Sequence, residues 1–147
     1  MYLIDGNNLI GHTKSLPHHS SAGARQLLLD RVTVFLEATR RKAIIVFDGT
    51  HEPLRKTSRV QLIFAGPRSS ADDVIRQRVE SSKSPKDLCV ISSDNGVYGY
   101  AKTCGVRALK CHEFNRLIQD ASGKIEEERD LSVGNTKEWL RYFGEEE

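Results

Sequence analysis

Short hydrophobic runs alternate along the chain with segments in which hydrophobic residues recur every three or four positions. Most of the runs have the length of a strand and are followed by turn-forming residues, such as the DGNN sequence at 5–8, where we expect a loop. The run at 43–47 (AIIVF) contains no polar residue, which is typical of a strand buried on both faces of a parallel sheet. We therefore expect five strands, at residues 2–4, 43–47, 60–65, 88–91 and 106–109.

Helical spacing of hydrophobic residues fills most of the intervals between these runs. Ser70, followed three residues later by Asp73, resembles a helix N-terminal cap. Gly123 and the charged stretch at 124–130 indicate a loop, after which Trp139, Leu140 and Phe143 return to helical spacing. The expected helices cover residues 24–41, 70–82, 97–104 and 112–121, with a C-terminal helical tail at about 132–144.

Strands and helices thus alternate through most of the chain. This alternation predicts an α/β fold with a mostly parallel sheet of about five strands and helices on both faces. The chain has 147 residues and no long linker, so we expect a single domain covering residues 1–147.

The composition is that of a globular protein, with 38% hydrophobic and 29% charged residues. No hydrophobic run approaches the length of about 20 residues that a membrane span needs, and the N-terminal segment has no signal-peptide pattern. We therefore expect a cytoplasmic protein with no membrane partner. The three cysteines, Cys89, Cys104 and Cys111, match no zinc pattern and are expected to be structural thiols.

The formal net charge of +2 is too small to indicate nucleic-acid binding by itself. Basic residues are nevertheless concentrated between Thr50 and Ala71, and charge alone fits either a patch that binds an RNA backbone or a solvated loop. His51, directly after Asp48-Gly49, is a candidate for substrate contact or acid–base chemistry. The basic candidates for substrate binding are Arg55, Lys56, Arg59 and Arg68.

Three of the expected strands are followed by an aspartate, namely Asp5, Asp48 and Asp94, and the Asp72-Asp73 pair opens a helix. Parallel strands end at the same edge of a sheet, so these carboxylates are expected to converge. Converging carboxylates repel one another and need a cation, and oxygen ligands favour Mg²⁺ or Mn²⁺ over zinc. Spacing alone leaves open both a metal site and a set of ordinary turns.

Four segments, in this order, resemble the motifs of NYN domains in the PIN-like nuclease superfamily. They are residues 3–10 (LIDGNNLI), 45–48 (IVFD), 70–75 (SADDVI) and 90–94 (VISSD). The order and spacing, and the closing segment at 138–144 (EWLRYFG), resemble the YacP-like branch in particular. The resemblance implies a PIN-like, Rossmann-like sheet. It also implies that the chain is an endoribonuclease, and some members of the family act on RNA at the ribosome.

The same resemblance implies a role for each matching residue. Asp5, Asp72 and Asp94 would hold Mg²⁺ or Mn²⁺, and Asp48 would hold a second cation or position the attacking water. The other matching polar residues are Asn8, which would orient the first loop, and Ser93, a hydrogen-bond donor to a ligand water.

Two residues depart from the family pattern or leave it open. Asn7 stands where many relatives have an aromatic residue, so a stacking role is in doubt there. Asp73 follows Asp72 directly, and adjacent residues on a helix point about 100° apart. Only one of the two can face the metal, and Asp73 is expected to be the N-terminal charge of the helix.

The leading hypothesis is a metal-dependent endoribonuclease whose partner is RNA. The ribosome is a further candidate partner, because some members of the family act there. The alternative is an RNA- or ribosome-binding module with weak or no catalytic activity. A phosphotransfer enzyme with an aspartate nucleophile ranks last, because Asp5 is followed by Gly6-Asn7 and not by a second paired aspartate. The oligomeric state is left open.

Overall fold

The computed structural model describes residues 1–16 and 22–133, with side chains described to residue 123. Its centre is a sheet of five parallel strands in the order β3-β2-β1-β4-β5. The strands are β1 (Tyr2–Asp5), β2 (Ala43–Phe47), β3 (Val60–Phe64), β4 (Cys89–Ile91) and β5 (Arg107–Leu109). The predicted α/β fold and all five predicted strands are therefore confirmed, with end positions that differ by at most one residue.

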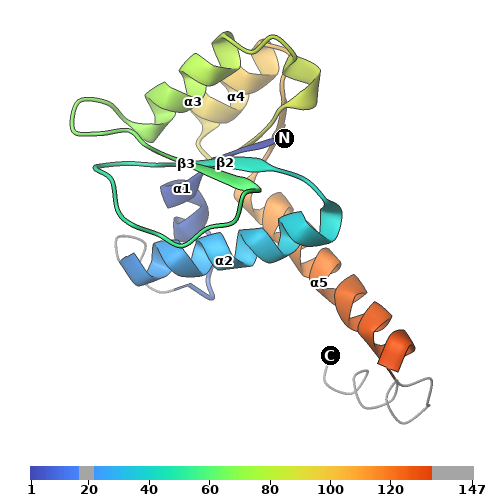
Figure 1. Ribbon diagram of the computed structural model, residues 1–147. Coiled ribbons are helices and arrows are strands. Elements are labelled where there is room, and N and C mark those ends of the chain that lie inside the picture. The colour runs from blue at the N-terminus through green and yellow to red at the C-terminus, as the bar shows by residue number, and fades with distance from the viewer. Residues whose placement is uncertain (17–21, 134–147) are drawn as a thin grey trace.

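Helices cover both faces of this sheet (Figure 1). One face is covered by α1 (Gly6–Gly11), α2 (Ala22–Thr39) and α5 (Cys111–Val133), and the other by α3 (Ala71–Glu80) and α4 (Asn95–Thr103). A short 3-10 helix, η1 (Pro85–Asp87), precedes β4. No helix within the described part of the chain has both the length and the apolar character needed to cross a membrane.

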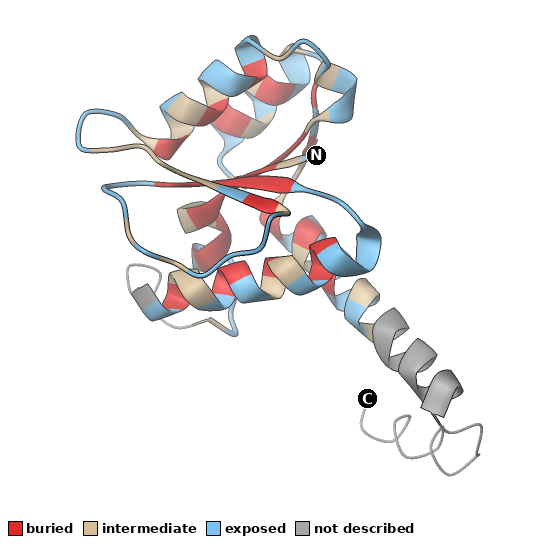
Figure 2. Cartoon of the chain, viewed as in Figure 1, coloured by how far each residue is buried: buried red, intermediate tan, exposed pale blue. Residues whose placement is uncertain are grey.

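Two hydrophobic cores follow from the alternation of side chains along each strand. Ile4, Ile45 and Ile91 pack against α1, α2 and α5, whereas Leu3 and Val90 pack against α3 and α4. Figure 2 shows the central strands as almost continuously buried. Both faces of β2 are buried, as its unbroken hydrophobic sequence predicts.

Two expectations about local structure are wrong. The turn-forming residues after β1 begin the helix α1 and not a loop. The helix α5 continues to Val133, although a break at Gly123 and a loop at 124–130 were expected. A single glycine costs only about 1 kcal/mol in a helix, and the Glu, Lys and Arg residues that follow it favour one. The tail expected at 132–144 lies outside the described residues beyond Val133.

The order of the strands reverses between β1 and β4. From β1 the chain adds β2 and then β3 on one side, and β4 and β5 are added on the other. In parallel α/β sheets, ligands bind beyond the carboxyl ends of the strands at such a reversal. Asp5 ends β1, and Ser92, Ser93 and Asp94 follow β4, so these residues lie at that point.

Candidate functional site

Asp5 is a carboxyl group that the fold buries at the end of β1, where only 8% of the residue is exposed. Its Oδ2 accepts a hydrogen bond of 3.1 Å from the hydroxyl of Ser92, which is fully buried after β4. Ser92 Oγ also accepts a hydrogen bond of 3.1 Å from the backbone N–H of Asp94. One serine therefore connects the carboxyl of Asp5 to the segment that carries Asp94.

Burial raises the pKa of Asp5 from 3.8 to about 6. The hydrogen bond from Ser92 and the nearby backbone N–H of Asn8 lower this pKa, and the negative charges of Asp48 and Asp94 raise it further. Carboxylates from the ends of three strands thus act on one another electrostatically. This convergence is the one that the sequence predicted.

Asn8 joins the start of α1 to the elements on either side of the strand reversal. Its Oδ1 accepts hydrogen bonds from the Ser93 backbone N–H at 2.7 Å and from the Cys111 thiol at 3.2 Å. Ser93 Oγ in turn accepts a hydrogen bond of 2.9 Å from the Cys111 N–H, at the first residue of α5. Asn8 and Ser93 therefore hold β1, β4 and α5 together beside Asp5.

Asp48 is exposed just beyond β2 and is held from two sides. Its backbone N–H donates to Asn7 Oδ1 at 2.9 Å, and its Oδ1 accepts the N–H of Ala71, the first residue of α3, at 2.8 Å. The guanidinium of Arg25 donates to its carbonyl oxygen at 3.2 Å. Asn7 thus positions Asp48, and Asp48 stabilises the N-terminus of α3, where a negative charge is favourable.

Asp94 is the N-cap of α4. Its Oδ1 accepts hydrogen bonds from Gly96 N–H at 2.8 Å and from Val97 N–H at 3.1 Å. An N-cap aspartate satisfies backbone donors that the first turn of a helix leaves unpaired. The second carboxyl oxygens of Asp94 and Asp48 accept no hydrogen bond within the described part of the chain, so one oxygen of each is available to a cation.

Asp72 lies on the first turn of α3 and pairs with an arginine that the sequence analysis did not single out. Arg76 Nε donates to Asp72 Oδ1 at 2.7 Å, and the guanidinium lies 5.1 Å above the ring of Tyr100. The hydrogen bond to Asp72 raises the pKa of Arg76, and the charge of Asp94 adds to the effect. Asp73 is exposed, and its N–H donates to the N-cap Ser70 at 3.1 Å.

The residues at this edge suit a hard divalent cation, although they do not enclose one. Among the residues that the structure describes, no three Asp, Glu, His or Cys side chains lie close enough together to form a metal cage. Mg²⁺ is commonly held by only one or two carboxylates, with water and substrate phosphates completing its shell. Asp5, Asp48 and Asp94 provide such carboxylates, and their repulsion, visible in the raised pKa of Asp5, is what a cation relieves.

The predicted substrate-binding residues divide between the two edges of the sheet. His51 packs edge-on against Phe64, with ring centroids 5.4 Å apart, and Arg68 is exposed before α3, so both lie at the carboxylate edge. Arg59 pairs with Glu37 at 3.2 Å immediately before β3 begins. It therefore lies at the opposite edge, and the structure does not bring it to the carboxylates.

Arg55 and Lys56 are exposed in the loop that connects β2 to β3. This loop is fixed to α2, because the side chain of Gln26 accepts from the Arg55 N–H at 2.9 Å and donates to its carbonyl oxygen at 3.0 Å. Glu52, in the same loop, pairs with Arg25 at 2.8 Å. The loop is thus an ordered segment of the surface.

Sequence reasoning missed Ser92, Arg76 and Arg25. A signal existed for Arg76, which follows Asp72 by four residues on a helix and so can pair with it. Nothing in the sequence distinguishes Ser92 from Ser93, because which of the two meets Asp5 depends on the register of β4 against β1.

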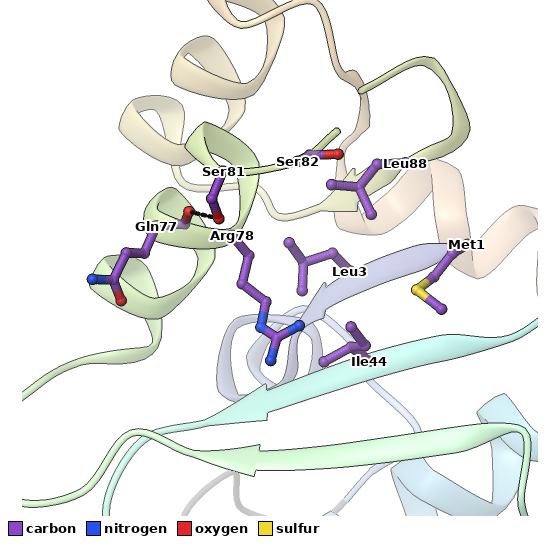
Figure 3. A pocket seen from close by; sticks show the side chains of 8 residues that line it. All are labelled: Met1, Leu3, Ile44, Gln77, Arg78, Ser81, Ser82 and Leu88. Atoms are coloured by element: carbon purple, nitrogen blue, oxygen red, sulfur yellow. Dashed lines mark hydrogen bonds between the residues drawn. The ribbon is translucent and has the colours of Figure 1, made fainter. Parts of the chain in front are cut away.

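Cavities are found at the edge opposite the carboxylates. One, of about 580 Å³, opens between α3 and the first residues of β1 and β2. Figure 3 shows the side chain of Arg78 extending past Leu3, with its guanidinium beside Ile44. Asp48 and Asp94 are both exposed, so the carboxylate site is open to solvent, which suits a polymer more than an enclosed small molecule.

The chain matches a known family of protein domains and resembles two solved structures. A family model described as the YacP-like NYN domain matches residues 2–142. A crystal structure of a mutant of Rae1 (YacP) from Bacillus subtilis has a TM-score of 0.76 at 23% identity, covering 96% of this chain and 88% of that one. A second structure of the same protein has a TM-score of 0.76 at 21% identity, covering 99% and 88%. These identities establish the shared fold alone. Among curated protein sequences, none matches the chain.

Proposed function

The chain belongs to the YacP-like NYN domain family, which has a nuclease-type fold, and on this premise we propose that it is a metal-dependent endoribonuclease hydrolysing RNA phosphodiester bonds. The observation that carries the proposal is the convergence of Asp5, Asp48 and Asp94 at the strand reversal, where burial and mutual repulsion raise the pKa of Asp5 to about 6. Asp48 and Asp94 each use one carboxyl oxygen at a helix N-terminus, but these structural roles do not account for the buried carboxyl of Asp5 beside them.

In this proposal Asp5 and the free oxygens of Asp48 and Asp94 would hold Mg²⁺ or Mn²⁺. Asp72 would contribute through the oxygen that does not bind Arg76. The cation supplies Lewis acidity toward the phosphodiester and the attacking water. Ser92 and Asn8 keep Asp5 and the segment at 92–94 in position through their hydrogen bonds.

Besides the metal ion, the side chain of Arg76 adds a positive charge to the site. It bonds to Asp72 and is within electrostatic range of Asp94, so it offsets part of their repulsion. A guanidinium can bind a phosphate in two-pronged fashion, and Arg76 is positioned to contact an RNA phosphate over the carboxylates. His51 and Arg68 at the same edge, with Arg55 and Lys56 along the adjoining loop, extend the surface that would bind the RNA backbone.

The proposal extends to ribosome-bound mRNA as the substrate, and hence to the cytoplasm as the place of action. Its support is the family resemblance of the four motifs and the open form of the site, which leaves room for a large partner. If cleavage requires the ribosome, the purified chain leaves naked RNA intact and cuts only ribosome-bound mRNA, so both substrates are tested.

One observation favours an alternative, an RNA- or ribosome-binding module with weak or no cleavage. The described residues contain no preformed cage of three metal ligands, and a binding module needs none. The alternative predicts that RNA binding survives every carboxylate substitution and that no substrate is cut.

Cleavage assays separate the two functions. Labelled single-stranded RNA, structured RNA and translating ribosomes are incubated with the purified chain in Mg²⁺, in Mn²⁺ and in EDTA. We expect cleavage that requires the metal and falls at least about 100-fold in Asp5→Asn and Asp94→Asn. Asp73→Asn removes an exposed carboxylate of α3 and is expected to retain activity. Cleavage that persists in Asp5→Asn, or binding without any cleavage, contradicts the nuclease function.

A further inference from the structure

A second cavity at the opposite edge of the sheet gathers positive charge. It has a volume of about 390 Å³ and lies at the starts of β1, β4 and β5, against α4 and α5. Its lining includes Tyr2, Cys89 and three cationic side chains, those of Arg41, Lys102 and Arg107. None of these three belongs to the carboxylate site or to the basic loop at 50–59.

The backbone directs Arg41 into this cavity. The helix α2 ends at Thr39, and Arg40 then takes a left-handed conformation with φ of 56°. The N–H of Arg41 donates to the carbonyl oxygen of Leu36 at 3.0 Å, which is the bond that closes a Schellman motif. This motif fixes the direction of the backbone after α2, so Arg41 lies at the edge of the sheet where β2 begins.

The two arginines converge on the same groups and have no acidic partner. The charges of Arg41 and Arg107 both lower the pKa of Tyr2 and that of Cys89, against the dominant effect of burial, which raises both pKa values. Within the described part of the chain, neither guanidinium has a carboxylate within 4 Å or a hydrogen bond. Like charges repel at this range, so the arrangement favours an anion between them.

The acidic side chains near this cluster form no ion pair with it within the described part of the chain, and the charge of Asp87 acts on the neighbouring amino group of Met1. Glu113 acts electrostatically on Lys102 and Cys89, but its Oε1 already accepts the N–H of Lys110 at 2.7 Å. Asp120 lines an adjoining cavity beside Arg41 without forming an ion pair with it. The cavity thus retains a positive charge.

A line of cations connects this cavity to the carboxylates. Lys102 and Lys110 lie over the ring of Tyr98, with their Nζ atoms 4.6 Å and 4.2 Å from its centroid. Lys110 Nζ also donates to Asn95 Oδ1 at 2.7 Å, and Asn95 follows Asp94 directly. The line runs along β5, which is an edge strand of the sheet. Cations beside an aromatic face are the usual means of binding a single strand.

We propose that the cavity binds a backbone phosphate of an RNA strand that then passes over Lys102, Tyr98 and Lys110 and enters the carboxylate site at Asp94. β5 is three residues long, so the two ends of this path are separated by roughly 10 Å along the strand. The path lies on the other side of Asp5 from the basic loop at 50–59. The proposal rests on RNA being the substrate, and it names where that RNA is bound.

The test measures binding without cleavage, so it uses the full chain carrying Asp5→Asn. Fluorescence anisotropy gives the Kd of a labelled single-stranded RNA for this chain and for the same chain with Arg41→Gln and Arg107→Gln. The matched control is Lys83→Gln with Lys86→Gln, which removes the same charge from exposed lysines outside the cavity. A thermal melt verifies that each variant is folded.

We expect the arginine pair to raise Kd at least about 10-fold and to reduce the salt dependence of binding by about one counterion, because the phosphate contact in the cavity is lost. The control pair is expected to change Kd less than about 3-fold. A second variant, Lys102→Gln with Lys110→Gln, is expected to weaken binding by a similar factor to the arginine pair. Equal Kd values for the arginine pair and the control overturn the proposal.

Side-chain NMR signals identify the source of the phosphate. The Nε–H resonances of Arg41 and Arg107 are expected to shift with the single-stranded RNA at concentrations where AMP and inorganic phosphate leave them unchanged. Shifts produced by AMP alone would assign the cavity to a free nucleotide and overturn the path. Loss of cleavage with retained RNA binding refutes the nuclease function but not this path, so the two proposals fail separately.

Discussion

At the scale of single residues, the carboxyl of Asp5 is removed from water to an extent unusual for a charged group. It is nearly buried, hydrogen-bonded to one serine and close to two other carboxylates. These surroundings favour its neutral form in the metal-free protein, so ionisation of Asp5 opposes folding. The burial of Asp5 therefore lowers the stability of the folded chain at a pH where this carboxyl is ionised.

The pH dependence of stability tests this conclusion. The folded pKa of Asp5, about 6, lies above the unfolded value of 3.8, so the folded state binds more protons between these pH values and loses stability as the pH rises through them. The loss reaches about 3 kcal/mol above pH 6. In EDTA, Asp5→Asn is expected to raise the free energy of unfolding by up to about 3 kcal/mol at pH 8, and by little near pH 4, as measured by urea titration.

An exposed residue provides the control for this measurement. Asp120→Asn on α5 is expected to give the same difference from the parent at both pH values. If Asp5→Asn behaves like Asp120→Asn, then the burial and repulsion attributed to Asp5 are wrong.

The sequence predicted that the strand-end carboxylates converge with Asp72, and the charges of Asp48 and Asp94 do act on Asp5, but how each carboxylate is held was not predicted. Asp5, Asp48 and Asp94 could be grouped because each follows a strand and parallel strands end together. The contacts of Ser92 and Arg76 could not be derived in the same way, because a hydrogen bond depends on register and rotamer at the scale of an ångström. For the same reason Arg59, which the sequence assigned to the RNA-binding loop, turned out to pair with Glu37 at the other edge.

At the scale of elements, the sequence wrongly predicted a loop where the structure has α1, and the packing of α1 explains the difference. Gly-Asn-Asn favours a turn locally, but tertiary contacts make these residues the first turn of a helix. Gly6 permits this because a Cβ there would lie 2.4 Å from Cε1 of Phe47 and 3.0 Å from Cγ2 of Ile45. The close approach of α1 to β2 then brings Asn7 to Asp48.

Substitution of glycines in two helices tests this packing. Gly6→Ala is expected to destabilise the chain by about 2–3 kcal/mol, because Phe47 is fully buried and cannot move aside without disturbing the core. Gly99→Ala in α4 is the matched control, since a Cβ there meets nothing within 4 Å. It is expected to stabilise the chain by about 0.5–1 kcal/mol through helix propensity. Similar urea midpoints for the two variants would contradict the close contact of α1 with β2.

At the scale of the whole molecule, charge is separated between the two edges of one sheet. Carboxylates gather at the carboxyl ends of the strands, and the cations of Arg41 and Arg107 lie at the amino ends. The alternation of hydrophobic patterns predicted the parallel sheet and its two helical layers. It could not predict the strand order β3-β2-β1-β4-β5, which depends on long-range pairing, and so could not reveal that β5 provides an exposed edge between the two charged regions.

Binding of Mn²⁺ to the purified chain, followed by electron paramagnetic resonance, tests the central claim most directly, because it needs no knowledge of the RNA target. The account predicts that the parent binds Mn²⁺ with an affinity that falls at least about 100-fold in Asp5→Asn and changes little in Asp73→Asn. Mn²⁺ binding that is equally strong in the parent and in Asp5→Asn would contradict the claim that the carboxylates at the strand reversal form the metal site.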